Sequence, residues 1–307
     1  MTKKTSIGGM ALLEGIMMIG PEKKSVAVRK PDGEIELTTE PLVHNKKIRK
    51  IPLVRGVYGI FTQMVYGVKA LMHAASLADI EGDEDEKTEP SRFEKWMDRR
   101  FGEKAFSIMI YFSVVIALFF SVGLFILLPN LIAGFISTGN VILNNLIEGV
   151  IRVSIFFTYI VLVSRMKDIR RVWMYHGAEH KTISTYENNQ ELTVENARKH
   201  SRFHKRCGTS FLFIVLIVSV LVFSFTGWNS IIVNLIARIL LIPVVAGISY
   251  EIIKYAGATD GLFSRIASAP GLFFQRFTTQ EPEDEMLEVA IEAFKAVIPE
   301  EEGSDKW

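Results

Sequence analysis

Residues 175–181, YHGAEHK, place two histidines and a glutamate within seven positions of a chain that has six histidines. If residues 166–187 are helical, His176 and His180 lie one turn apart on one face, with Glu179 beside them. Two imidazoles at this spacing suit zinc or another borderline divalent cation, with manganese and iron as alternatives. A neighbouring carboxylate can accept a proton from water activated by the cation. The segment therefore predicts a divalent-metal site with Glu179 as general base.

The order H-x-x-E-H is also the signature of the inverted zinc peptidases, which take a third ligand from a distant helix. Glu251, in the segment SYEIIKYA, is the first candidate for that ligand, and His204 is the second. The alternative interpretation is a structural network of polar side chains at the rim of a membrane.

A second group of potential ligands follows in the same region. His200, His204 and Cys207 are spaced i, i+4 and i+7, which would put them on one helical face. Cys207 could be a thiolate ligand or a nucleophile, although a small buried thiol at a helix start is the commoner case. The many neighbouring basic residues fit equally well with a solvated surface near lipid head groups.

Glu14 lies among glycines and apolar residues in the segment GGMALLEGIMMIGP, residues 8–21. An unpaired buried carboxylate is costly, so Glu14 must meet a cation, a metal or a hydrogen-bond donor. Arg206, His204 and a metal at the 176–180 site are the candidates. We therefore expect this segment to fold over the histidine cluster as a lid or a wall. The alternative is a structural loop in which Glu14 caps a helix.

The composition indicates a membrane protein. Hydrophobic residues make up 49% of the 307 residues and the mean hydropathy is +0.25, which is too apolar for an ordinary soluble domain. Since about 20 apolar residues cross a bilayer as a helix, the pattern predicts four spans, near 105–128, 142–164, 209–226 and 230–252. The predicted fold is mainly α-helical and polytopic. Arg238 falls inside the fourth span and should face a polar interior rather than lipid.

The distribution of basic residues predicts the orientation of these spans. Lysines and arginines gather at 92–104, 165–171 and 202–206, whereas the connections within the first and second pairs of spans have none. The positive-inside rule then puts both termini and the 165–208 segment in the cytoplasm. The single cysteine excludes an intramolecular disulfide, which agrees with a reducing compartment. No basic segment carries the interleaved aromatic residues of a nucleic-acid reader, so we expect the lipid bilayer and not nucleic acid as a partner.

The hydrophilic segments divide into three parts. The N-terminal part, 1–104, should be mixed α/β, with a β-hairpin near 25–40 around Asp32-Gly33 and an acidic linker at 81–90. Its helical pattern at 52–78 fits an interfacial or re-entrant helix and a cytosolic core helix equally well. The spans at 105–164 and 209–253 enclose a histidine-rich cytosolic part, 165–208. The C-terminal part, 254–307, should contain an amphipathic helix that packs on the N-terminal part.

Four separated motifs carry a resemblance to a known family: GGMALLEGIMMIGP (8–21), YHGAEHKTISTYE (175–187), HKRCGTSF (204–211) and TTQEPEDEMLEVAI (278–291). Together they resemble the bacterial YqhQ family of polytopic membrane proteins, an uncharacterised family predicted to be metal-dependent enzymes, over nearly the whole chain. Met10 is a departure, because such proteins often have glutamine there. The resemblance implies a place in the bacterial cytoplasmic (inner) membrane and a metal site. It carries that site onto His176, Glu179 and His180, and more loosely onto Glu14, His204, Arg206 and Cys207.

The first functional hypothesis is a metal-dependent hydrolase that faces the cytosol and acts on a lipid-like or membrane-protein substrate. The alternative is a non-catalytic membrane scaffold or assembly factor with a structural polar cluster. A transporter is a distant third hypothesis, which rests on Arg238 alone. The sequence does not decide between a monomer and a homo-oligomer.

Overall fold

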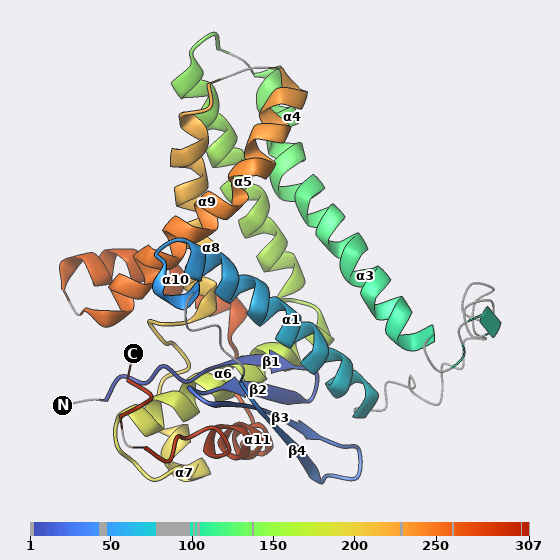
Figure 1. Ribbon diagram of the computed structural model, residues 1–307, viewed down its shortest axis with the longest axis vertical. Coiled ribbons are helices and arrows are strands. Elements are labelled where there is room, and N and C mark those ends of the chain that lie inside the picture. Colours follow the sequence, from blue (N-terminus) through green and yellow to red (C-terminus); the bar gives the residue numbers. More distant parts are fainter. Residues whose placement is uncertain are drawn as a thin grey trace.

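The computed structural model describes residues 3–42, 48–77, 99–100, 102, 105–136, 138–227, 230–259, 261–301 and 303–306. A bundle of long helices stands on a smaller part in which helices cover a β-sheet, and both ends of the described chain lie in that smaller part (Figure 1). The predicted acidic linker, 81–90, lies outside the described residues.

The sheet has four antiparallel strands in the order β1-β2-β3-β4, namely β1 (Gly8–Leu12), β2 (Gly15–Ile19), β3 (Lys23–Arg29) and β4 (Ile35–Pro41). The hairpin predicted near 25–40 is β3 and β4, which turn at Gly33 with a φ of 88°. The first hairpin was not predicted. It turns at Leu13 and Glu14, and Glu14 takes a left-handed φ of 50°. The segment expected to be a lid is therefore half of the sheet.

Helices cover both faces of this sheet. Ile16, Met18 and Ala27 join one apolar cluster with α6 (Lys167–Glu187) and α11 (Asp284–Lys295). Met17 and Val28 face the opposite way and pack against α1 (Val54–Leu77). The amphipathic C-terminal helix thus buries its apolar stripe against the N-terminal strands. The short helix α7 (Val194–Arg198) packs against α6 and α11.

The bundle consists of apolar helices. It contains α3 (Ala105–Val122), a π-helical turn at Gly123–Leu127, α4 (Leu128–Phe135), α5 (Val141–Val163), α8 (Gly208–Ser224) and α9 (Ile231–Ala258). Within the described chain, three segments are long and apolar enough to cross a membrane: Ile108–Phe135, Val141–Val163 and Ile232–Ala258. Phe119 and Leu240 leave 76% and 71% of their surface exposed, as lipid-facing side chains do.

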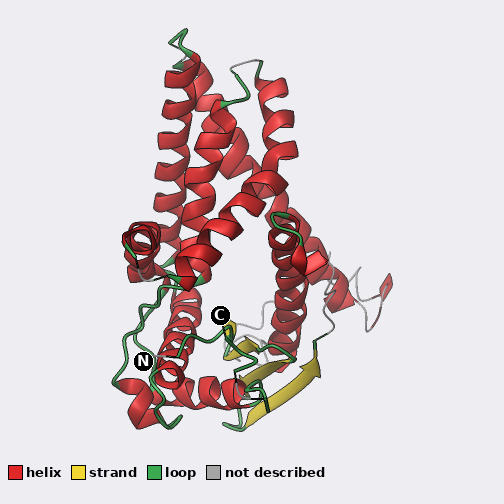
Figure 2. Ribbon diagram, turned by 60° about the vertical axis from the view of Figure 1, so that its left-hand side comes forward, coloured by secondary structure: helices red, strands yellow, loops and turns green. Residues whose placement is uncertain are grey.

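The mainly helical architecture is confirmed, and within the described residues three of the four predicted spans coincide with helices long and apolar enough to cross a membrane. The third predicted span is α8, which is apolar but has only 17 residues. After α9 the chain forms α10 (Leu262–Thr278), which was not predicted and lies across the end of the bundle nearest the sheet (Figure 2).

Helix α1 contacts both parts of the molecule. Near its start, Gly56 lies so close to the Tyr250 side chain of α9 that a Cβ atom would come within 2.6 Å of it. Arg55 forms an ion pair with Glu251 of α9. Further along α1, Ala70 and Ala74 pack under the sheet. The helix therefore sets the position of the sheet relative to the bundle.

A buried ion cluster holds the bundle together. Glu148 of α5 accepts hydrogen bonds from both Arg152 and Arg238, and Arg238 is 0% exposed. The Arg152 Nε donates to the Phe125 carbonyl, 2.9 Å away, in the π-helical turn. A π-turn leaves carbonyls outside the regular helical ladder, so the cluster satisfies one of them. Arg238 thus faces a polar interior, as its place inside an apolar segment led us to expect.

Replacing Glu148 with glutamine should destabilise the bundle, because it leaves two buried guanidinium groups facing an uncharged partner. We expect the free energy of unfolding in detergent to fall by about 3–5 kcal/mol. The double variant Glu148→Gln, Arg238→Gln should recover part of this loss, since it removes one buried charge. Thermal or denaturant unfolding measures both effects, and a wild-type melting temperature for Glu148→Gln would contradict the prediction.

Candidate metal centre

Three buried side chains converge beneath the bundle: His176 and His180 from α6, and Cys207 from the N-cap of α8. Their potential ligand atoms all lie within 4.8 Å of one another. Helix α6 is not a continuation of α5, because the chain breaks the helix around Ser164–Met166 and Met166 is extended. The one-turn spacing nevertheless brings the two imidazole rings to a centroid distance of 4.4 Å.

Backbone carbonyls orient both imidazoles. The Nδ1 of His176 lies 2.7 Å from the Thr278 carbonyl oxygen, and the Nδ1 of His180 lies 2.6 Å from the Arg202 carbonyl oxygen. Since a carbonyl can only accept, each Nδ1 must carry the hydrogen, and in the neutral ring Nε2 is left with the lone pair. The Nε2 of His176 lies 3.1 Å from the Cys207 Sγ. Metal-binding histidines are held in this way, with the distal nitrogen hydrogen-bonded and the other facing the ion.

These donors fit a divalent cation. In a tetrahedral zinc site, zinc–nitrogen distances of about 2.0–2.1 Å and zinc–sulfur distances of about 2.3 Å put the ligand atoms roughly 3.3–3.7 Å apart. The 3.1 Å between His176 Nε2 and Cys207 Sγ is close to this spacing. Two imidazoles and one thiolate also leave a fourth position for water or substrate, as catalytic zinc sites do.

The same contacts change the proton affinities of the free side chains. Burial alone would raise the pKa of Cys207, but the adjacent His176 and His180 outweigh it and hold the pKa well below its ordinary value. Burial lowers the pKa of His176, whereas the negative Cys207, with smaller contributions from Glu179 and the Thr278 carbonyl, raises it to about 9. Without a metal, both shifts favour a thiolate beside an imidazolium, and a metal bound to the Nε2 of His176 would displace the proton there.

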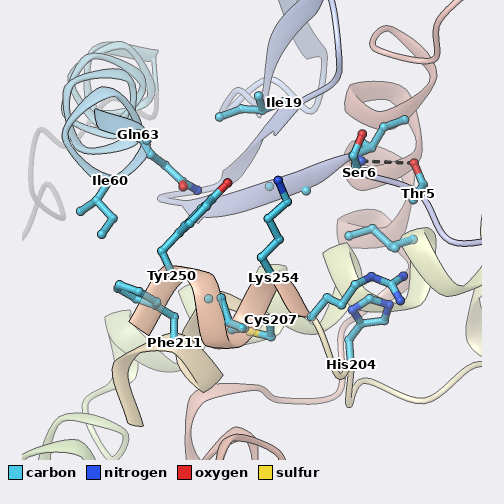
Figure 3. A pocket seen from close by; sticks show the side chains of 18 of the residues that line it. Thr5, Ser6, Ile19, Ile60, Gln63, His204, Cys207, Phe211, Tyr250 and Lys254 are labelled. Carbon is cyan, nitrogen blue, oxygen red and sulfur yellow. Dashed lines mark hydrogen bonds between the residues drawn. The ribbon is translucent and has the colours of Figure 1, made fainter. Parts of the chain in front are cut away.

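Glu179 and two of the three potential ligands lie beside a cavity. The Oε1 of Glu179 accepts a hydrogen bond from the Gly9 N–H of β1, 2.9 Å away. Glu179, His180 and Cys207 line a cavity of about 440 Å³, whose other walls come from residues 5–9, α1 and α9. Figure 3 shows Cys207 and His204 on one side of this cavity and residues of α1 on another. A substrate in the cavity would thus meet the carboxylate and two of the potential ligands, His180 and Cys207.

A second polar network supports the centre. Glu187 accepts hydrogen bonds from the His204 Nε2 at 3.2 Å, from Arg206 and from the Thr5 N–H at 2.8 Å. Burial raises the pKa of Glu187, but these donors outweigh it and lower the pKa. His204 is also fixed through its backbone, since its N–H and its carbonyl both bond to the Gln275 side chain of α10 at 2.8 Å. His204 and Arg206 therefore lie near the centre and hold its surroundings.

Several predicted site residues lie elsewhere. Glu251 is engaged by Arg55 and by the Leu53 N–H at 3.1 Å, so Cys207, and not Glu251, is the third donor beside the histidines. His200 hydrogen-bonds to Gln190 at 2.8 Å. The predicted helical face through His200, His204 and Cys207 is wrong, because residues 199–207 form turns between α7 and α8.

Glu14 was expected to pair with Arg206, His204 or the metal, but its partners are different residues. Its carboxylate binds the Arg171 guanidinium at 2.5 and 2.6 Å and lies 3.3 Å from the Tyr175 hydroxyl, whereas Arg206 binds Glu187. The N-terminal segment does form a wall of the site, but through Gly9 and the residues before it. Arg238 belongs to the bundle cluster described above.

The backbone groups that orient the site could not be predicted from the sequence. These groups are the carbonyls of Thr278 and Arg202 and the N–H of Gly9. Residue type does not reveal them, because almost every residue has the same backbone groups. Gly177 does offer a signal, because a Cβ atom there would lie 2.1 Å from the Gln280 carbonyl oxygen. A glycine between the two histidines therefore allows the chain after α10 to approach α6.

Comparison with known proteins identifies the family. The family model described as "Protein of unknown function (DUF1385)" matches residues 51–300, which include the three potential ligands and Glu179. The chain belongs to this family. It is also 33% identical over 305 residues to the uncharacterised protein YqhQ of Bacillus subtilis strain 168, covering 95% of this chain and 92% of that protein. The resemblance to the YqhQ family is thus confirmed. No solved structure matches this DUF1385 chain.

Replacing Gly177 with alanine should disturb the centre, because the Gln280 backbone would have to move and carry Thr278 away from His176. We expect a loss of about 1–3 kcal/mol in unfolding free energy, as for other overpacked sites. Metal affinity should weaken about 10–100-fold, as it does when a partner of a ligating histidine is lost. Gly208→Ala is the control, because a Cβ there meets nothing within 4 Å. Equal stability and metal affinity in the two variants would contradict the prediction.

The low pKa of Cys207 can be tested by alkylation, because the chain has one cysteine. In chelator-treated protein, the rate of reaction with iodoacetamide should change little between pH 6 and 8, since the thiol is already ionised. In His176→Ala the pKa should rise and the rate should fall on acidification. Mass spectrometry of the Cys207 peptide measures the rate. A wild-type rate that falls about tenfold per pH unit, like a free thiol of pKa about 8.5, would refute the assignment.

Proposed function

We propose that this protein is a metal-dependent hydrolase of the bacterial cytoplasmic membrane. The observation that carries the proposal is the pair of carbonyl-bound imidazoles whose Nε2 atoms share a site with the Cys207 thiol, next to Glu179 and a cavity. A purely structural network would not require two buried histidines to be oriented with the same nitrogen toward one thiol.

The proposed role of each side chain follows from the atom that it offers to a metal or to a proton. His176, His180 and Cys207 would hold the cation, and two nitrogens with one sulfur favour zinc over manganese or iron. Zinc bound there would supply a Lewis acid for a substrate carbonyl or phosphoryl oxygen. The Gly9 N–H fixes the carboxylate of Glu179 through Oε1. We assign Oε2 to accept the proton of the attacking water and to return it to the leaving group.

The site would face the cytosol. Basic residues gather at 165–171 and 202–206, next to α6 and α8, and this distribution favours the cytoplasmic side. The sheet and both ends of the described chain lie at the same end of the bundle (Figure 1), so a single orientation would place the whole smaller part inside the cell.

A second candidate function is catalysis by Cys207 itself. The thiol caps the N-terminus of α8, where a thiolate is favoured, and lies 3.1 Å from a histidine oriented by a carbonyl. Cys207 would then attack a substrate carbonyl without a metal. A non-catalytic scaffold is the third alternative, in which the Glu187 network and the buried histidines are structural.

Metal content distinguishes the first candidate from the others. We expect detergent-purified protein to hold about one equivalent of zinc by elemental mass spectrometry, as a site with three protein ligands would. The double variant His176→Ala, His180→Ala should lose it, and Cys207→Ser should bind it more weakly. The absence of metal from wild type, even after reconstitution with zinc, would refute the metal-dependent reaction.

Replacing Glu179 with glutamine separates catalysis from structure. The variant should keep its metal and its melting temperature, but hydrolysis in a panel of lipid-like esters and membrane peptides should fall by about 10²–10⁴-fold. Glu191→Gln is the control, because Glu191 is exposed and outside the cavity lining. If only Cys207 variants lose activity, the thiol is the nucleophile; if a biological effect survives every one of these changes, the scaffold explains it.

A further inference from the structure

The cavity wall that faces the candidate centre is built from elements next to the membrane. Residues between Tyr58 and Tyr66 of α1, Phe211 near the start of α8, and Tyr250 and Lys254 of α9 all line it. Helix α9 is one of the spans, and these residues lie near its end, where it meets α1 and the smaller part (Figures 1 and 3). With α9 across the bilayer, this cavity would lie at the end of the span, where lipid head groups are found.

The outer surface of α1 is suited to contact with lipid. Phe61 is 61% exposed, and Val54 and Met64 are also exposed, although all three are apolar. The start of α1 is held against α9 by the Arg55–Glu251 ion pair and by the close approach at Gly56. The start of this exposed face is thus held next to α9, one of the candidate spans. A helix with an apolar face at the edge of the bilayer lies in the interface, and here it is also one wall of the cavity.

Polar groups converge inside the cavity. The side chains of Gln63, Tyr250 and Lys254 point toward the same space (Figure 3). The charged side chains of the lining are three bases and one acid, namely Arg55, Arg206, Lys254 and Glu179. Three of the four Lys, Arg, Asp and Glu side chains of the lining are therefore basic, and two of them, Arg55 and Arg206, form ion pairs with Glu251 and Glu187.

We propose that the cavity takes the head group of an anionic phospholipid, whose acyl chains remain in the bilayer beside α1. The volume of about 440 Å³ holds a glycerophosphate head group but not two long chains. A soluble phosphate ester would not need a wall with an apolar, exposed outer face. This inference rests on the proposed function, since it names the substrate class of the same centre.

Lipid retention by the detergent-purified full chain tests the inference without an activity assay. Native mass spectrometry would compare binding of phosphatidylglycerol, phosphatidylcholine and soluble glycerol 3-phosphate. We expect phosphatidylglycerol to bind about fivefold more tightly than phosphatidylcholine, the effect of one basic residue on an anionic lipid. Glycerol 3-phosphate should not displace it. Equal binding of the two lipids would overturn the anionic preference, and displacement by glycerol 3-phosphate would indicate a soluble ligand.

Two pairs of variants locate the binding. Gly59 lines the cavity and a Cβ there meets nothing within 4 Å, so Gly59→Leu should fill the cavity without unfolding the helix; Gly134→Leu, at an equally open glycine of α4, is its control. Lys254→Gln should lower phosphatidylglycerol binding about fivefold, whereas Lys167→Gln, an exposed base outside the lining, should not. Unchanged binding in Gly59→Leu would overturn the proposal.

The zinc content of the same samples keeps the two proposals apart. Zinc without cavity-dependent lipid binding would overturn the substrate class alone. Cavity-dependent lipid binding without zinc would overturn the metal-dependent reaction and leave a lipid-binding site.

Discussion

The centre depends on two hydrogen bonds from imidazoles to backbone carbonyls. The Thr278 carbonyl stands at the end of α10 and the Arg202 carbonyl in the turns before α8, so each bond links α6 to a different segment of the chain. The His176 bond is buried and the His180 bond partly buried, and a buried imidazole without such a partner would be costly. The packing of α6 beneath the bundle is therefore fixed by the same contacts that orient its histidines. A substitution that moves α6 would therefore also change the orientation of its two histidines.

The chain ends secure the same region from the other side. Thr5 bonds through its N–H to Glu187 and through its hydroxyl to Asp305 at 2.8 Å, while Gly9 holds Glu179. Lys3 adds an ion pair to Asp305 and a hydrogen bond to Tyr186. The first residues of the chain thus connect the C-terminal tail to α6. Because these groups are buried or partly buried, water competes with them only weakly.

The sequence predicts those features that are periodic or compositional. Charge-free segments mark the spans, and the alternation around Asp32-Gly33 marks the hairpin of β3 and β4. The hairpin of β1 and β2 was not predicted, because β2 is buried on both faces and its sequence shows no alternation of apolar and polar residues. His176, Glu179 and His180 were found from local spacing. The third ligand was expected to be Glu251 or His204 rather than Cys207, because local spacing does not reveal that Glu251 pairs with Arg55, which lies 196 residues from it in the sequence.

The order of the elements along the chain has a consequence for biosynthesis. The sheet is made first, but its partner α11 is made last, after every span has been synthesised. Ile16, Met18 and Ala27 therefore emerge from the ribosome long before Leu287 and Phe294 exist to cover them. Apolar surface that waits in this way is prone to aggregation or chaperone capture. The nascent N-terminal hairpins must remain protected throughout membrane insertion, and the carbonyl that orients His176 becomes available only after α10 has been made.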